Sequence, residues 1–113
     1  MARYEHLNVY KEVYNLSVSL FFNVSKFDRN YKFTIWSKIT EIIIEILELI
    51  IFLNNLELKD RKKYFLDLEQ KLEKLTIFIN IANDLKILWK TQNYLEYLEI
   101  LVKVKKMVKC WNK

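Results

Sequence analysis

The residues whose type and spacing could do chemistry in this chain are cationic, and they form two groups. The first group lies near the carboxyl end and consists of Lys103, Lys106, Lys109 and Lys113. On a helix these lysines fall within about a third of the circumference, because each residue turns the helix by about 100°. No acidic residue follows Glu99. The spacing therefore predicts an uninterrupted basic stripe.

The second group consists of Lys59, Arg61, Lys62 and Lys63, at the start of a predicted helix. Cations at a helix N-terminus oppose the helix dipole, so local stability does not favour them there. Phosphates of RNA or DNA are the natural ligands of such groups. We take all eight residues as candidate nucleic-acid-binding residues, with an ordinary solvated surface as the alternative. The net charge of +5 permits an anionic partner without demonstrating one.

Residues for catalysis or metal binding are not grouped in a usable way. His6 is the only histidine and Cys110 the only cysteine, and they lie at opposite ends of the sequence. Glu41, Glu45 and Glu48 share one helical face, but carboxylate metal sites in helical bundles pair glutamates with Glu-x-x-His motifs, which are lacking here. A chain without glycine has no glycine-rich phosphate loop. We expect no catalytic residues, no metal site and no cofactor.

The composition indicates the elements that must carry these residues. The chain has 113 residues and neither glycine nor proline, which argues against tight hairpins and for long helices in one domain, residues 1–113. No apolar run reaches the ~18 residues of a membrane span, and the first residues lack the apolar segment of a signal peptide. With a single cysteine, these features predict a cytoplasmic protein that does not enter the membrane.

The apolar periodicity predicts an all-α protein with four helices, at about 7–25, 34–53, 60–88 and 91–108. Short connections between long helices favour antiparallel neighbours, so we expect an up-down-up-down four-helix bundle. Three residues are candidate N-caps, namely Thr34, Asp60 and Thr91. Asn54 and Asn55 are candidates for a left-handed C-cap.

Three of the helices have apolar residues that recur at steps of three and four. The first predicted set is Tyr10, Val13, Tyr14, Leu20, Phe21 and Val24. The third helix has a regular stripe of Leu68, Leu72, Leu75, Ile79 and Ala82. The fourth helix has Tyr94, Leu98, Leu101 and Val108 along one line, which also contains Lys105.

The second helix is apolar over most of its circumference. Its residues from Ile42 to Leu53 cover roughly 220°, whereas a helix of an isolated bundle needs a stripe only a little over 100° wide. The surplus predicts burial against another copy of the chain. The alternatives are a fully central helix, or a drift from Val and Leu to Ile in an AT-rich coding sequence. The residues expected at this interface are Ile43, Ile44, Leu47 and Ile51.

The order of several short segments resembles the accessory variability determinant (Avd-like) family of four-helix-bundle proteins from bacterial diversity-generating retroelements. The segments are residues 31–35, 45–50, 71–75, 81–88 and 94–98, with the closing Trp111. The resemblance spans nearly the whole chain. Trp36, Lys109 and Cys110 stand where the family usually has glycine, and Asn8 where it has proline. We therefore expect Trp36 at the subunit interface, where it would change either the local packing or the contact between subunits.

The resemblance implies a barrel-like homopentamer of four-helix bundles with a basic surface. It also implies binding to a reverse transcriptase and to nucleic acid during mutagenic cDNA synthesis. A related branch is encoded in intervening sequences of bacterial large-subunit ribosomal RNA genes. That branch provides the alternative interpretation, a structural bundle that binds protein and does not bind nucleic acid directly.

Overall fold

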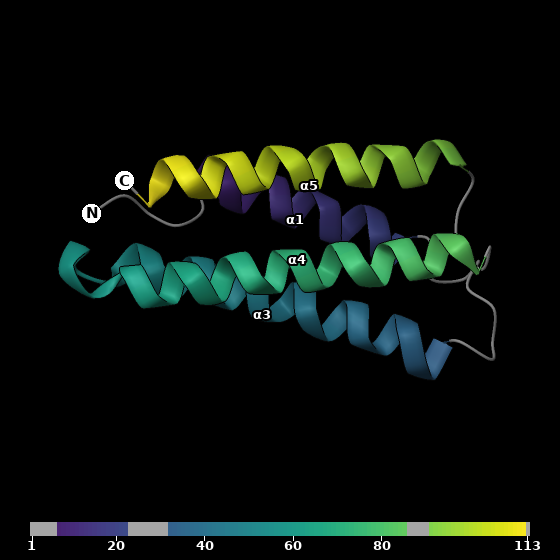
Figure 1. Ribbon diagram of the computed structural model, residues 1–113, viewed down its shortest axis with the longest axis horizontal. Coiled ribbons are helices and arrows are strands. Elements are labelled where there is room, and N and C mark those ends of the chain that lie inside the picture. The colour runs from purple at the N-terminus through teal and green to yellow at the C-terminus, as the bar shows by residue number, and fades with distance from the viewer. Residues whose placement is uncertain (1–6, 23–31, 86–90, 113) are drawn as a thin grey trace.

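The computed structural model describes residues 7–22, 32–85 and 91–112. Four α-helices lie within these ranges, as Figure 1 shows: α1 (Asn8–Phe22), α3 (Ser37–Asn55), α4 (Lys62–Asp84) and α5 (Thr91–Trp111). A π-helical turn, η3 (Lys32–Trp36), leads into α3, and a 3-10 turn, η4 (Leu58–Asp60), precedes α4. The predicted ends of the first and third helices, Ser25 and Leu88, lie outside the described residues, and α4 ends at Asp84 within them.

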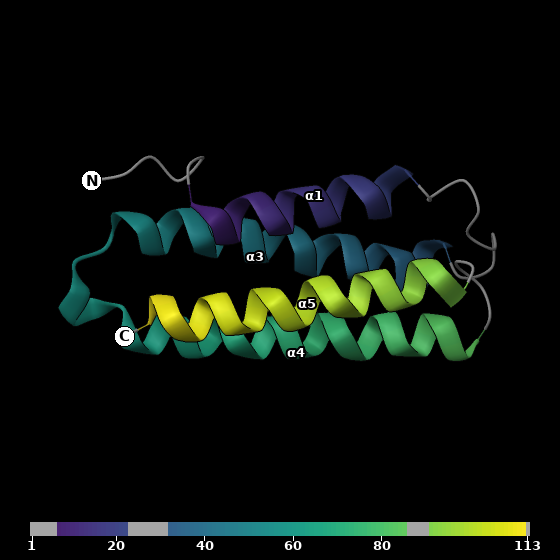
Figure 2. The same ribbon diagram turned by 90° about the horizontal axis from the view of Figure 1, so that it is seen from above.

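The four helices form an elongated antiparallel bundle with extents of 44 × 22 × 19 Å. α1 packs against α3 and α5, and α4 packs against the same two helices, so the four axes occupy the corners of a square (Figures 1 and 2). Successive helices run in opposite directions, which confirms the predicted up-down-up-down four-helix bundle. No helix of the described residues combines the length and the apolar character needed to cross a membrane.

Two helices begin differently from the prediction. Thr34 lies inside η3, and Trp36, at the N-cap position of α3, has helical φ and ψ angles of −62° and −44°. Similarly, Asp60 is the last residue of η4, and Arg61 precedes α4 with φ −78° and ψ −28°. Neither Thr34 nor Asp60 caps a helix, because the preceding turn is already helical and an N-cap residue needs an extended backbone.

The end of α3 also differs from the prediction. Asn54 and Asn55 are its last two residues and do not form a left-handed cap, because Leu56 ends the helix with extended angles of φ −85° and ψ 149°. The side chain of Asn55 donates a hydrogen bond of 3.2 Å to the carbonyl oxygen of Ile51. The Asn55 side chain is thus held against the last turn of its own helix.

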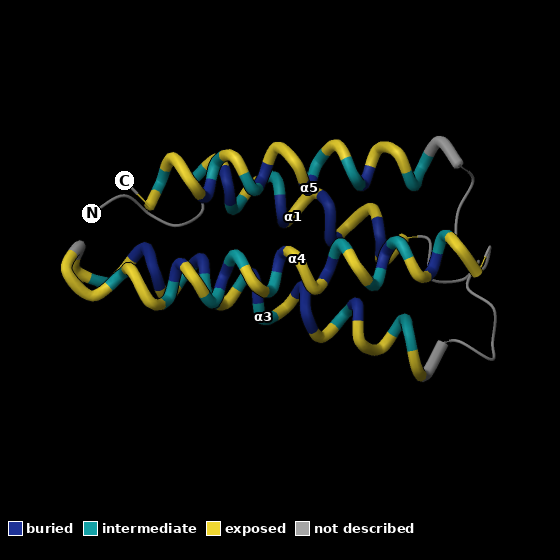
Figure 3. The backbone as a smooth tube through the Cα atoms, in the orientation of Figure 1, coloured by how far each residue is buried: buried dark blue, intermediate teal, exposed yellow. Residues whose placement is uncertain are grey.

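The core lies along the axis of the bundle, where Figure 3 shows buried residues on the inner side of each helix. The predicted stripe of α4 is confirmed, since all five of its residues are fully buried. α3 contributes more to the core than a simple amphipathic helix does, with Ile39, Ile42, Ile43, Ile46, Ile50 and Leu53 all buried. The placement of Ile43 at a subunit interface is therefore wrong, because its side chain is 0% exposed within a single chain.

The inner faces of α1 and α5 differ from the predicted ones. In α1 the buried residues are Val9, Val13, Leu16, Ser17 and Leu20, whereas Tyr14 and Phe21 point outward. In α5 they are Tyr97, Leu101, Val104 and Val108, so the inner face includes two residues of the predicted line and is turned from it by about 50°. Both helices have apolar residues on more than one face, so their periodicity is compatible with several inner faces, and contacts with the neighbouring helices select one.

Candidate nucleic-acid interface

The fold brings the two cationic groups to the same end of the bundle. The start of α1, the end of α3, η4 with the start of α4, and the end of α5 all lie there, as the two perpendicular views in Figures 1 and 2 show. We call this region the basic end and define it by five exposed lysines, Lys59, Lys62, Lys63, Lys106 and Lys109. Lys113, the last predicted member, lies outside the described residues.

Arg61 connects the two groups through the ring of Trp111. Its guanidinium carbon lies 6.0 Å from the centroid of the Trp111 ring, and its Nε donates a hydrogen bond of 3.0 Å to the carbonyl oxygen of Leu56. Phe65 meets the same ring edge-to-face at 5.0 Å. The start of α4 is thus joined to the last turn of α5. Arg61 therefore has a structural role that the sequence pattern did not indicate.

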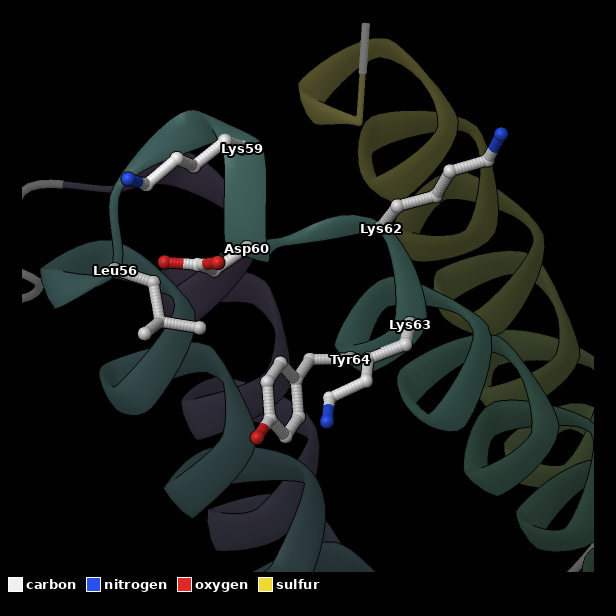
Figure 4. Close-up of a pocket in the computed structure, with 6 residues that line it drawn as sticks. All are labelled: Leu56, Lys59, Asp60, Lys62, Lys63 and Tyr64. Carbon is white, nitrogen blue, oxygen red and sulfur yellow. The ribbon is translucent and has the colours of Figure 1, made fainter.

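The lysines around η4 point in different directions, as the close-up in Figure 4 shows. They surround a surface hollow of about 530 Å³, which Leu56, Asp60 and Tyr64 also line. The ammonium group of Lys59 lies 3.7 Å from Glu57, and that of Lys63 lies 4.9 Å from the centroid of the Tyr64 ring. Lys62 extends away from Lys59 (Figure 4) and makes no ion pair with the residues that the structure describes.

The predicted stripe on α5 contains both paired and unpaired lysines. Lys103 lies at the boundary with α1 and donates a hydrogen bond of 2.8 Å to Glu12. Lys105, which was not among the candidates, forms an ion pair of 2.6 Å with Glu73 of α4. Lys106 and Lys109 point outward, are exposed, and form no ion pair within the described ranges. Lys106 and Lys109 thus remain available for an external anion, whereas Lys103 is already neutralised by Glu12.

Two of the glutamates on the outer side of α3 form ion pairs with lysines. Glu41 lies 3.7 Å from Lys38, and Glu45 accepts a hydrogen bond of 3.0 Å from Lys71 of α4. This hydrogen bond, together with the negative charge of Asp67 nearby, raises the pKa of Lys71 above its usual value even though partial burial lowers it. The described residues contain no group of three or more histidine, cysteine or acidic side chains that could hold a metal ion.

A second surface is apolar and lies on the outer sides of α1 and α3. We call it the apolar face and define it by Tyr14, Val18, Phe21, Trp36 and Ile44. The last two share a surface hollow with the glutamates of α3. Val18 and Tyr14 are 52% and 50% exposed, and Ile44 is 47% exposed. Phe21 meets Trp36 edge-to-face at 5.9 Å, which joins the two helices at this surface. The predicted interface contains no residue of α1, because Tyr14 and Phe21 were predicted only as members of the recurring apolar set of the first helix.

The remaining predicted interface residues, Leu47 and Ile51, are partly buried. Leu47 packs against the core cluster. Ile44 is thus the most exposed aliphatic residue of the predicted set. Most of the apolar surface of α3 is buried within a single chain. The apolar residues left over belong to two helices and not to α3 alone.

No family model matches the chain, and neither a curated protein nor a solved structure is similar enough to match it.

Proposed function

We propose that this chain is a non-enzymatic accessory protein that binds nucleic acid through the basic end and assembles into a homo-oligomer. The observation that carries this proposal is the meeting of two lysine groups, distant in the sequence, at one end of the bundle. Lys62, Lys106 and Lys109 are exposed there and make no ion pair with described residues. Unpaired cations on one surface attract a polyanion, and the release of its counterions supplies binding free energy.

The partner and the setting in this proposal come from the resemblance to the Avd-like family. The partner is the reverse transcriptase of a diversity-generating retroelement in a bacterial cytoplasm, and the assembly is a homopentamer. The basic end has no arrangement for reading bases by paired hydrogen bonds among its described residues, so the lysines would bind phosphates without sequence preference. The protein partner would then supply specificity for a particular template.

The apolar face supports the assembly of several copies. Exposed apolar residues scattered singly are normal, whereas exposed apolar residues of two helices that meet at the surface, as Phe21 and Trp36 do, are a candidate protein interface. The apolar face and the basic end consist of different residue types. The first is made of aromatic and aliphatic residues and the second of lysines. Association through the apolar face would leave the lysines accessible and repeat them around the assembly, which strengthens the local field.

The test is a charge reversal of the unpaired lysines. The variant Lys62→Glu/Lys106→Glu/Lys109→Glu is compared with the wild-type protein in the binding of a short labelled single-stranded RNA, between about 50 and 200 mM salt. We expect the affinity at low salt to fall by about a hundredfold or more, and the slope of log K against log salt to decrease by about one for each lysine.

The matched control is a reversal at Lys74, an exposed lysine on the outer side of α4 that forms no ion pair within the described residues. Lys74→Glu should leave the salt slope unchanged. Sedimentation should give the same mass for the triple variant as for the wild-type protein, because the substituted lysines lie outside the apolar face. Affinity of the wild-type protein that does not change with salt would contradict the proposal.

The second candidate function is a structural bundle that binds only protein, as in the related branch found in ribosomal RNA intervening sequences. The apolar face is the observation that favours it, because this surface needs no nucleic acid to explain it. A protein of this kind would self-associate and retain neither RNA nor DNA at low salt. The same binding measurement therefore distinguishes the two functions.

A further inference from the structure

A groove lies between the start of α1 and the last turns of α5, next to the basic end. Its volume is about 450 Å³. Its apolar lining comes from Leu7 and Val9 on one side and from Met107 and Trp111 on the other. The side chains of Lys103 and Lys106 also line it. The groove thus places apolar surface beside an exposed cation.

The Trp111 ring is held in a defined position at this groove. Phe65 contacts it edge-to-face at 5.0 Å, and the Arg61 guanidinium lies 6.0 Å from its centroid. An aromatic wall that is already positioned loses little conformational entropy when a ligand binds. Met107 adds a flexible, polarisable side chain that adapts to flat aromatic groups.

The charges select among the ligands that fit an apolar groove of this size. A volume of about 450 Å³ lies within the range of small-molecule sites and is ample for one ring system. Lys106 is unpaired with respect to the described residues, and Lys109 is exposed one turn further along α5. The complementary ligand is therefore a flat apolar group that carries an anion on a short linkage. A nucleotide of a single strand, with its base and its phosphate, has this form.

We infer that the groove binds one unstacked base of a single-stranded nucleic acid while Lys106 and Lys109 contact the adjacent phosphates. The inference rests on the proposed function and specifies its substrate class. Bases of a duplex are paired and stacked, so they cannot enter the groove without being flipped out. The basic end would bind a duplex only through its backbone. The protein should therefore prefer single strands, and the preference should come from the groove and not from the lysines.

Cys110 provides a direct test, because it is exposed, lines the groove and is the only cysteine of the chain. The wild-type protein is alkylated with iodoacetamide, and the rate is followed by intact mass, with and without a single-stranded RNA whose binding is monitored by anisotropy. At an RNA concentration of about ten times Kd, mass action leaves roughly a tenth of the grooves empty, so the rate should fall about tenfold. A duplex of equal length at the same saturation should slow the reaction much less.

The matched control moves the thiol out of the groove. In Val102→Cys/Cys110→Ser the cysteine lies on the same helix at a site that is 51% exposed and is not part of the groove lining. Bound RNA should leave its alkylation rate nearly unchanged. Met107→Gln, which keeps the length of the side chain and makes it polar, should weaken single-strand binding about fivefold and leave duplex binding as it is.

Two results would overturn the inference. If RNA binds and Cys110 reacts as fast as in the free protein, or if a duplex protects it equally well, the bases do not occupy the groove, and the proposed function still stands. If no RNA or DNA binds even at low salt, the proposed function fails and the inference fails with it. Anisotropy and alkylation together separate these cases.

Discussion

The basic end and the apolar face are both left outside the core, but the chain builds them in different ways. The basic end joins residues that are distant in the sequence and that meet because helices α4 and α5 run in opposite directions. The apolar face lies along two neighbouring helices, and its residues come from positions that a period of 3.6 could also assign to the core. Charge can therefore be recognised from residue type, whereas the outer position of an apolar residue depends on its neighbours.

Adjacent isoleucines of α3 give the largest expected contrast. Ile43 is fully buried and Ile44 is 47% exposed. Ile43→Ala should lower the free energy of unfolding by about 2–5 kcal/mol, because it leaves a cavity in the core. At a protein concentration at which the chain is monomeric, Ile44→Ala should change it by less than about 0.5 kcal/mol. Urea denaturation under matched conditions measures both. Equal effects of the two substitutions would contradict the assignment of Ile43 to the core and Ile44 to the surface.

A charged pair on the apolar face tests whether this surface mediates association. Val18→Asp/Ile44→Asp places one carboxylate on each helix of the face, and two buried, unpaired charges would prevent docking of another copy. We expect sedimentation to give the 13.9 kDa monomer for this variant and a multiple of it for the wild-type protein. Leu66→Asp, at a residue of α4 that is 57% exposed, is the control and should keep the assembly. A wild-type protein that is already monomeric would contradict the association.

Lys103 and Lys106 test whether ion pairing decides which lysine of the basic stripe binds phosphate. Glu12 already neutralises Lys103, whereas Lys106 has no ion pair within the described residues. Lys106→Gln should decrease the salt slope of RNA binding by about one, as expected for one lost phosphate contact. Lys103→Gln should decrease it less. The opposite order in anisotropy titrations would show that the Lys103–Glu12 pair opens when nucleic acid binds.

The smallest expected effect concerns the ion pair between Lys71 and Glu45, which joins α3 to α4. The hydrogen bond with Glu45 raises the pKa of Lys71 in the folded protein. The ion pair therefore stabilises the fold fully below the pKa of a lysine in the unfolded chain, about 10.4, and this stabilisation is lost as pH rises through the pKa of the folded state. Lys71→Met should remove about 0.5 kcal/mol at pH 8, and the difference from the wild-type protein should shrink at higher pH. Lys74→Met is the matched control, and an equal loss in both variants would exclude a specific role for this pair.

The fold class follows from local chemistry alone. A chain without glycine or proline and with a regular stripe such as Leu68, Leu72 and Leu75 forms long helices, and short connections make them antiparallel. The helix starts were less predictable. Thr34 and Asp60 have the residue types of N-caps, but helical turns precede α3 and α4, so the backbone at both positions is unsuited to capping.

The residue types of the candidate site could be predicted from the sequence, but the contacts that its side chains make with other residues could not. Lysines at positions 59–63 and 103–109 are visible in the sequence as cationic groups. Their common location, the pairing of Lys103 with Glu12 and the contact of Arg61 with Trp111 involve partners that are distant along the chain. Periodicity carries no information about such partners, because it describes one helix at a time.

The amino-acid order of this protein therefore determines properties of each helix taken singly: its existence, its approximate limits and the charge of its surface. The packing of four helices adds the rest, including which face of α1 is buried, which lysines stay unpaired and where a groove opens beside Trp111. The physical reason lies in the range of the forces. Backbone hydrogen bonds and helix propensity act within a few residues, whereas burial and ion pairing depend on whichever helix lies alongside.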